Sequence, residues 1–389
     1  MSILISIFIN NYFSILSLGL LLLFFGCSTS EDNPPVSTPP QGDIIDSYNI
    51  PVVDNDGWLV NDLGISDSKK TLLLNGIDKI RRGAYGEIHS LLIVHDKKLV
   101  LEKYYSGRNS NGQFINFDRF TKHEVQSSSK SFRSALMGIA IDKGFIDDVD
   151  SKLFSFFPEL QHLRTPQKDK ITLDHMLTMS SGLEWDEWSY SFGDPRNSLS
   201  TLYAKPASQW VSHILGLPLK YEPGSTFAYN TGASISLNTI IINSIPINYE
   251  SFLRTYYTDL IESKDLPGLG YPLGASTTPR DMAKLGYIFL YDGKWKDIQV
   301  LSPEWIEKSI TKRFQVNSTL GYGYQWWTRT LRTASTNYDV FYANGNGGQF
   351  VIIIKDLDIV IVSTGGKFGT AGDEIFNLIV QHVLPAFEN

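Results

Sequence analysis

Hydrophobic and polar positions along this chain predict strands near both ends and helices between them. Two short apolar runs, residues 91–94 and 99–101, are separated by four polar residues, which predicts a β-hairpin. Near the C-terminus, residues 349–354 and 359–362 are apolar runs joined by a short polar segment, so they predict two adjacent antiparallel strands. A further strand is predicted over residues 338–342.

The middle of the chain has helical spacing instead. Apolar residues recur at helical intervals from Phe132, and Gly144 is a predicted helix stop. Residues 147–218 lack β-branched alternation, and a closing helix is predicted over residues 373–383. We therefore predict an α/β fold of the α+β sandwich kind. Its antiparallel sheet is formed from both chain ends and flanked by helices, and a mainly helical subdomain is inserted at roughly residues 145–285.

The N-terminus has an apolar run that ends at Cys27, the only cysteine of the chain. This context resembles a bacterial lipoprotein signal, although Phe24 is unusual there and no Lys or Arg precedes the run. An uncleaved membrane anchor is the alternative, since residues 3–25 are long enough to span a bilayer. We predict a signal peptide over residues 1–27, lipidation of Cys27, a disordered tether over 28–45 and a folded domain over 46–389. The expected location is the bacterial cell envelope, periplasmic or at the cell surface, with a membrane lipid anchor.

Charge and histidine spacing exclude other classes of protein. The formal net charge is −7 over 389 residues and no basic cluster is present, so nucleic acid is not an expected partner. The seven histidines are scattered and form no metal-ligand spacing. We therefore expect neither a metal nor another cofactor.

A candidate nucleophile lies at the start of the predicted central helix. Ser127 and Lys130 are three residues apart, which on a helix is near contact. Lys130 could accept the proton of the Ser127 hydroxyl if burial or neighbouring cations suppressed its own charge. The alternative is that Ser127, Ser128 or Ser129 only caps the helix.

Two later segments could complete such a site. Tyr229 follows the turn at residues 222–224, so its phenol can project into a cleft; beside a lysine ammonium its pKa would be lowered and it could act as a base. The alternative is a core tyrosine. Residues 344–350 contain three glycines and enter a buried strand, so a ligand could approach the backbone closely, although a loose glycine turn is the alternative. A nucleotide-binding loop is excluded because such a loop opens a helix.

Taken in order, these segments resemble the serine β-lactamase and penicillin-binding-protein superfamily, in its class C β-lactamase-like branch, which also contains esterases, D-amino-acid peptidases and aminohexanoate-oligomer hydrolases. Its three motifs match Ser127-x-x-Lys130, Tyr229-Asn230-Thr231 and Asn346-Gly347-Gly348. Five longer blocks also resemble this branch: residues 127–142, 171–183, 221–232, 278–286 and 321–327.

The resemblance implies a hydrolase that forms an acyl-enzyme. Ser127 would attack a carbonyl, Lys130 would assist its deprotonation, and Tyr229 would relay a proton. The backbone amides of Ser127 and Gln349 would form the oxyanion hole. Asn346, Gly347, Gly348 and Thr231 would complete the substrate-binding residues.

Two departures from the motifs bear on the substrate. Thr231 stands where Asn or Ser is usual, and uncharged Asn346 stands where Lys or His is usual. Because that cation engages the substrate carboxylate in β-lactamases, a small ester or amide is expected rather than a penicillin. The alternative is a catalytically silent relative that binds a ligand or a peptidoglycan fragment.

Three other segments have less direct roles. His175 is predicted to be structural, with partners of its own. Residues 184–188, which include two tryptophans, are predicted to line the cleft from the helical side, with surface packing as the alternative. Arg280 and Asp281 are predicted to form an ion pair at a helix start.

Overall fold

The structure is a computed structural model that describes residues 47–265, 275–370 and 372–388. The predicted signal peptide, Cys27 and the tether through residue 45 lie outside these ranges. Within them, no helix combines the length and apolar character that crossing a bilayer requires.

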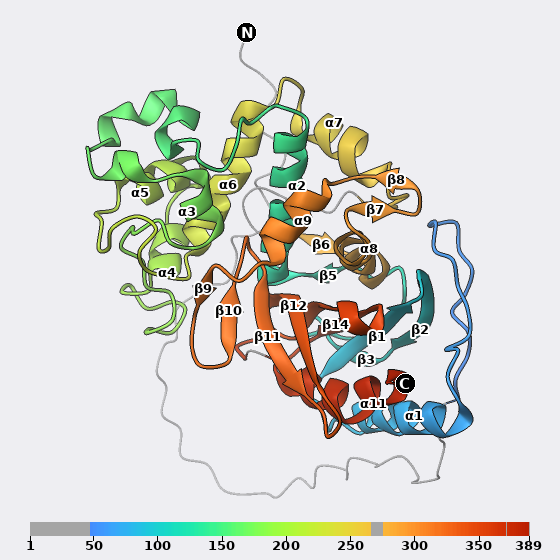
Figure 1. Cartoon of the computed structure of the whole chain (residues 1–389). Helices are drawn as coiled ribbons and strands as arrows, with labels where there is room; N and C mark the ends of the chain where they lie inside the picture. The colour runs from blue at the N-terminus through green and yellow to red at the C-terminus, as the bar shows by residue number, and fades with distance from the viewer. Residues whose placement is uncertain (1–46, 266–274, 371, 389) are drawn as a thin grey trace, which may run out of the picture. The chain divides into compact units, whose positions relative to one another are not determined.

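An eight-stranded antiparallel sheet joins the two ends of the folded region (Figure 1). Its strand order is β2-β1-β14-β13-β12-β11-β10-β9. The N-terminal strands are β1 (Ile88–His95) and β2 (Lys98–Tyr104), and the others are β9 (Phe314–Gln315), β10 (Leu320–Tyr322), β11 (Trp327–Arg332), β12 (Asn337–Gly345), β13 (Gln349–Ile354) and β14 (Ile359–Gly365). Because β1 pairs antiparallel with β14, the sheet forms from both chain ends, which confirms the predicted fold class.

The two predicted strand pairs are confirmed. The β1–β2 connection is the two-residue turn Asp96-Lys97, in which both residues have positive φ, 47° and 63°. That backbone matches the twist of a tight hairpin, although neither residue is a glycine. In the β13–β14 ladder, Phe350 lies opposite Ser363 at one end and Ile354 lies opposite Ile359 at the other. Neighbouring residues of these two strands belong to different cores on the two faces, which explains their continuous apolar sequence.

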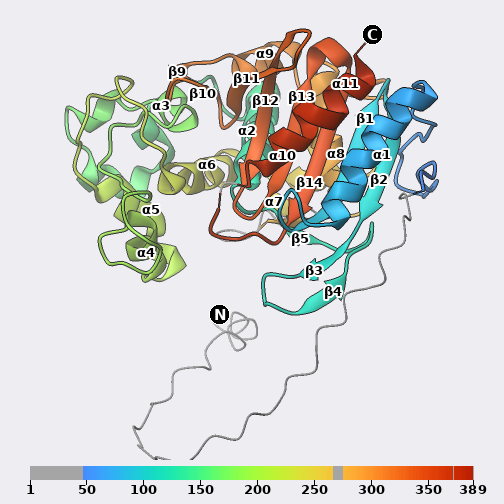
Figure 2. The same cartoon turned by 90° about the horizontal axis from the view of Figure 1, so that it is seen from below.

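Helices cover both faces of the sheet. One face carries α1 (Asp67–Arg81) and the C-terminal helical segments, which lie together in Figure 2: α10 (Glu374–Leu378), a π-helical turn (Ile379–Val383) and α11 (Leu384–Phe387). The closing helical region therefore extends four residues past its predicted end. The other face carries α8 (Pro279–Leu290), which packs against β13 and β14. Contact with the sheet therefore resumes at this helix, before the predicted end of the helical subdomain at residue 285.

The helical subdomain contacts the sheet layer through the central helix α2 (Ser129–Asp142). This helix begins three residues earlier than predicted, and its residues from Ser129 to Ala140 are all buried. It ends before Gly144, whose φ of +70° suits a helix stop. Helix α6 (Thr231–Ser244) packs on α2, and the other helices of this region are α3 (Leu173–Leu177), α4 (Ser198–Tyr203), α5 (Trp210–Gly216) and α7 (Tyr249–Leu253).

An N-terminal segment covers the outer edge of β2. The amide of Leu99 donates to the carbonyl of Leu59 at 2.8 Å, and the amide of Asn61 donates to the carbonyl of Leu99 at 3.2 Å. Val60 forms a parallel bridge with Leu99. Main-chain groups of this edge strand are thereby paired with the protein's own chain.

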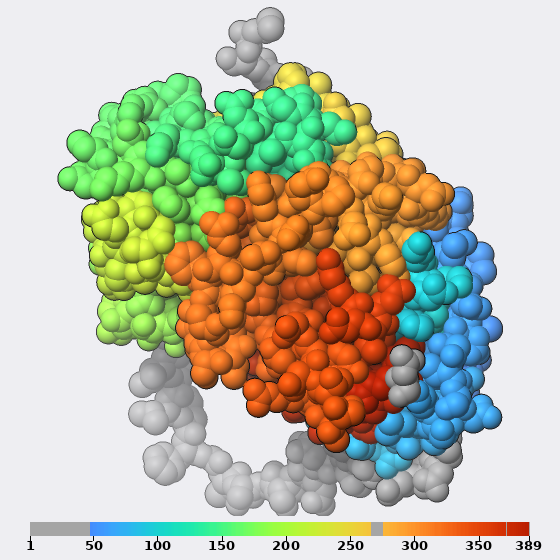
Figure 3. Space-filling model, in the orientation of Figure 1, coloured from blue at the N-terminus to red at the C-terminus, as the bar shows by residue number. Residues whose placement is uncertain are grey.

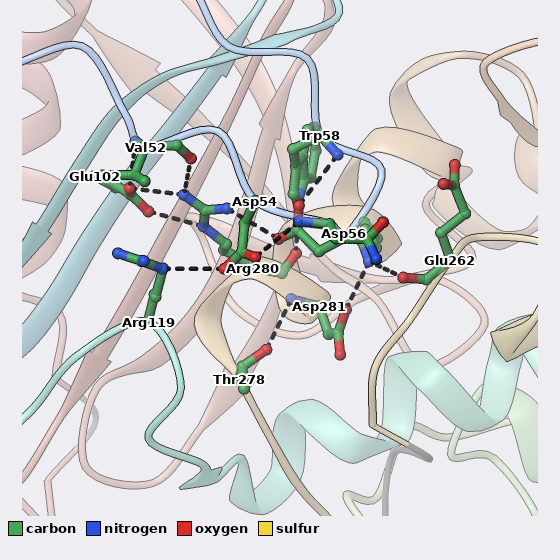
Figure 4. Close-up of polar contacts among 12 residues, drawn as sticks. Val52, Asp54, Asp56, Trp58, Glu102, Arg119, Glu262, Thr278, Arg280 and Asp281 are labelled. Carbon is green, nitrogen blue, oxygen red and sulfur yellow. Dashed lines mark hydrogen bonds and ion pairs between the residues drawn. The ribbon is translucent and has the colours of Figure 1, made fainter.

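The predicted ion pair between Arg280 and Asp281 is wrong. Arg280 instead donates to Glu102 at 2.7 and 2.9 Å and to Asp56 at 3.0 Å, as Figure 4 shows. Asp281 pairs with Lys284 at 2.9 Å, one turn further along α8. Residues i and i+1 face different directions on a helix, so Arg280 faces the N-terminal segment. The Asp281 amide donates to the Thr278 hydroxyl at the helix start, and its carboxylate accepts from Ser263 at 2.8 Å.

Candidate active site

The structure brings Ser127 and Lys130 into contact where a short 3₁₀-helix (Gln126–Ser128) leads into α2. The Lys130 Nζ atom donates to the Ser127 Oγ atom at 2.9 Å. Ser127 is partly exposed, whereas Lys130 is buried. Gln126, directly before Ser127, has a φ of +51°, an uncommon conformation for a residue with a side chain and one that is concentrated at functional sites.

The capping alternative is not supported by the hydrogen bonds. Ser128 precedes the first residue of α2 and makes no side-chain cap bond. Its hydroxyl instead donates to the carbonyl of Gln349 at 2.5 Å. The Ser129 hydroxyl accepts from Arg133 at 3.1 Å. Ser127 is therefore the serine of this triplet whose hydroxyl meets Lys130.

Burial changes the protonation of Lys130 as the sequence analysis required. Loss of hydration lowers the pKa of Lys130 to about 7; the Glu187 carboxylate opposes this shift, and the Arg133 guanidinium adds to it. A substantial fraction of the amine is then neutral at neutral pH and able to accept a proton.

Tyr229 lies at the same place, and not in the hydrophobic core. The Lys130 Nζ atom is 4.9 Å from the centroid of its ring. Trp188 stacks on Tyr229 with centroids 4.9 Å apart, and Trp327 stacks with centroids 5.7 Å apart. The ring thus joins the helical subdomain to β11. In Figure 3 the green and yellow surface of this subdomain adjoins the orange surface of later parts of the chain.

The predicted lowering of the Tyr229 pKa is wrong. Burial raises the pKa of Tyr229 well above its usual value and the Glu187 carboxylate raises it further, while a hydrogen bond with Ser127 acts in the opposite direction. Lys130 is itself buried and is not a permanent cation, so it does not outweigh these effects. The phenol is protonated at neutral pH and can donate a proton or a hydrogen bond.

The glycine turn between β12 and β13 lies against the segment that carries Ser127. A Cβ atom on Gly345 would be 2.2 Å from the carbonyl oxygen of Val125, so only glycine fits there. Gly347 and Gly348 have φ values of +92° and +100°. This turn, together with the Ser128–Gln349 hydrogen bond, brings the start of β13 beside Ser127.

Asn346 and Thr231 already have partners within the protein. The Asn346 side-chain oxygen accepts from the amide of Gly369 at 2.7 Å, which ties the glycine turn to the loop after β14. Thr231 is the first residue of α6, and its amide and hydroxyl both donate to Glu187, at 2.9 and 2.8 Å. These two departures from the motifs therefore have structural uses in this chain.

Glu187 is a residue of this site that sequence reasoning did not single out, as are Arg133 and Trp327. Its carboxylate accepts from the Thr231 amide and hydroxyl and from the indole of Trp185 at 2.6 Å. The only sequence signal was its position within residues 184–188, predicted to line the cleft; Trp185, Glu187 and Trp188 do lie at the site.

Other candidate residues have simpler roles. His175 forms a reciprocal capping box with Thr172 at the start of α3, so it is structural as predicted. In the part of the chain that the structure describes, no group of three or more His, Cys, Asp or Glu residues could hold a metal ion.

Comparisons with known proteins agree with this geometry. The Beta-lactamase family model matches residues 81–381, more than half of the chain. The chain therefore belongs to the β-lactamase family, within the serine β-lactamase and penicillin-binding-protein superfamily, whose members are serine hydrolases.

Solved structures with a similar fold include three proteins of low sequence identity. An octameric penicillin-binding protein homologue from Pyrococcus abyssi has a TM-score of 0.63 at 17% identity, with 82% of this chain and 78% of that chain covered. EstCE1, described as a hydrolase with promiscuous acyltransferase activity, has a TM-score of 0.64 at 13% identity (80% and 97% covered). Simvastatin synthase from Aspergillus terreus has a TM-score of 0.63 at 12% identity (82% and 99% covered). These likenesses support the fold.

Proposed function

We propose that this chain is an exported serine hydrolase that cleaves a small ester or amide through an acyl-enzyme. The observation that carries the proposal is the 2.9 Å contact between the buried amine of Lys130 and the hydroxyl of Ser127. Tyr229 lies beside both, with its ring 4.9 Å from the amine and a hydrogen bond to Ser127. A lysine with a pKa of about 7 can act as a base near neutral pH.

The proposed reaction has two acyl-transfer steps. The Ser127 Oγ atom attacks the carbonyl carbon as its proton passes to Lys130, and the amides of Ser127 and Gln349 stabilise the oxyanion. The tetrahedral intermediate then expels the alcohol or amine, which takes a proton from the Tyr229 phenol. Lys130 returns a proton to Tyr229. Water attacks the acyl-enzyme by the same route in reverse and releases the acid and free Ser127.

The surroundings of the site favour esters or amides over penicillins. Asn346 supplies no positive charge at the position where β-lactamases engage a carboxylate. Trp188 has 62% of its surface exposed although it stacks on Tyr229, so the approach to the site includes an apolar aromatic wall. The acyltransferase activity named for EstCE1 fits the same acyl-enzyme scheme.

Labelling with a fluorophosphonate probe tests the proposal directly. We expect a single covalent adduct, located on Ser127 by peptide mass spectrometry, and turnover in a panel of chromogenic esters and D-amino-acid amides that exceeds turnover of a chromogenic cephalosporin. Folded protein that neither labels nor hydrolyses any member of the panel would instead support a silent, ligand-binding relative.

Export through a lipid anchor on Cys27 is part of this proposal and is separable from the chemistry. It is supported by the apolar run that ends at the only cysteine of the chain. In a bacterial host, Cys27→Ser is expected to move the protein out of the membrane fraction, as measured by fractionation and immunoblotting. An unchanged membrane fraction would favour an uncleaved anchor.

A further inference from the structure

Glu187 is a carboxylate in an unusual position beside the proposed catalytic residues. It lies on the loop between α3 and α4 and is only partly exposed. Its three hydrogen-bond donors, the amide and hydroxyl of Thr231 and the indole of Trp185, are all uncharged. Within residues 47–265, 275–370 and 372–388, no cationic side chain lies at ion-pair distance from it. Its charge is therefore available to act on neighbouring groups.

Arg133 is a buried cation that acts on Lys130 with the opposite sign to Glu187. It lies one turn along α2, is buried, and donates to the hydroxyls of Ser129 at 3.1 Å and Ser234 at 3.4 Å. No carboxylate among the described residues pairs with it. Two charges of opposite sign, neither neutralised by an ion pair, therefore act on Lys130 in a region from which water is largely excluded.

Glu187 also fixes the segment that carries Tyr229. Its carboxylate holds the amide and the hydroxyl of Thr231, two residues after Tyr229. Trp188, which directly follows Glu187 in the chain, stacks on the Tyr229 ring with the two ring planes 18° apart. Two adjacent residues of the loop between α3 and α4 therefore hold this segment: Glu187 binds the main chain at Thr231, and Trp188 packs on the Tyr229 ring.

We propose that Glu187 is a positioning residue that acts through Thr231 and Lys130. Through Thr231 it holds the turn that places Tyr229, and by its charge it offsets the effect of Arg133 on the amine. This role deepens the proposed hydrolase function and rests on it. It also explains why a threonine suits the third position of the second motif, because its short hydroxyl and its amide can reach the same carboxylate.

The test measures the rate of fluorophosphonate labelling of Ser127 against pH. The groups that act on Lys130 are Arg133 from its own helix, Glu187 from the loop and the protonated phenol of Tyr229. Labelling needs neutral Lys130, so the rate rises with pH through the lysine pKa, near 7 in the native protein. The Glu187 anion stabilises the ammonium form, so Glu187→Gln is expected to move the midpoint to lower pH by on the order of one unit.

Three further variants separate charge from structure. Arg133→Met removes a cation and is expected to move the midpoint to higher pH, which keeps the charge balance testable if Glu187→Gln does not fold. Thr231→Val keeps the charge but loses one hydrogen bond, so it is expected to slow labelling roughly tenfold with the midpoint unchanged. Glu159→Gln, an exposed acid of the same subdomain, is the matched control and should change neither quantity.

The outcomes are distinguishable. Shifts of opposite sign in Glu187→Gln and Arg133→Met support the inference. Slower labelling of folded Glu187→Gln without a shifted midpoint would show that Glu187 acts only through its hydrogen bonds to Thr231, and it would overturn the action through Lys130. Absence of labelling in the unmodified protein would overturn the proposed function itself.

Discussion

Ser127→Ala is expected to lower ester hydrolysis by at least about 10⁴-fold, because it removes the oxygen that forms the acyl-enzyme while Lys130, Tyr229 and the glycine turn stay in place. The measurement is kcat/KM on the best substrate of the panel, with thermal unfolding followed in parallel. The structure predicts little change in the unfolding temperature, since the Ser127 hydroxyl is partly exposed and alanine is a good helix former.

Ser134→Ala is the matched control for this change. Ser134 lies on the same helix, is buried, and its hydroxyl is 3.5 Å from that of Ser309, a long and weak contact. Its activity should stay within a few-fold of the unmodified protein. If Ser127→Ala retained most of the activity while Ser134→Ala lost it, the nucleophile would have been assigned to the wrong serine.

Arg280→Met is expected to destabilise the folded protein by about 3–5 kcal/mol, because it leaves the buried carboxylates of Asp56 and Glu102 without their cation. Arg280 also donates to the carbonyl of Val52 at 2.8 Å. Burial tends to lower the pKa of Arg280, but its hydrogen bonds and charge interactions with Glu102 and Asp56 raise that pKa overall, so the guanidinium stays charged. Urea unfolding followed by tryptophan fluorescence measures the change.

Arg119→Met tests whether burial is the cause. Arg119 pairs with Asp54 at 3.2 Å in the same N-terminal region (Figure 4), but both side chains are about 30% exposed. Exposed pairs contribute little because water and salt screen them, so a much smaller change is expected. Equal losses in the two variants would mean that the Arg280 cluster owes its importance to something other than desolvated charge.

Sequence reasoning predicted the central strands of the sheet well because β1, β13 and β14 are buried on both faces. The continuous apolar runs of β13 and β14 are explained by helices on either side, and such runs are readable without coordinates. Strands β9 to β11 were not predicted as strands. Strands β9 and β10 are short, and residues 320–322 and 327–332 mix glycine, aromatic and charged residues without a clear alternation.

At the site, the residues could be predicted but their electrostatics could not. Ser127, Lys130 and Tyr229 were found from motifs, and the direction of the Lys130 shift followed from burial. The Tyr229 shift was predicted with the wrong sign, because the sequence does not show how deeply the phenol is desolvated or that Glu187 is near. The Arg280 partners are 178 and 224 residues away along the chain, a separation that carries no local signal.

The N-terminal segment that pairs with β2 affects how copies of this protein can associate through their sheets. A strand at the end of a sheet offers its main chain to any other strand, and residues 59–61 occupy that place on β2. Proteolysis that released the chain ahead of α1 would uncover it. Clipped molecules are then expected to join sheet to sheet, so the pairing of residues 59–61 with β2 is expected to guard this protein against aggregation.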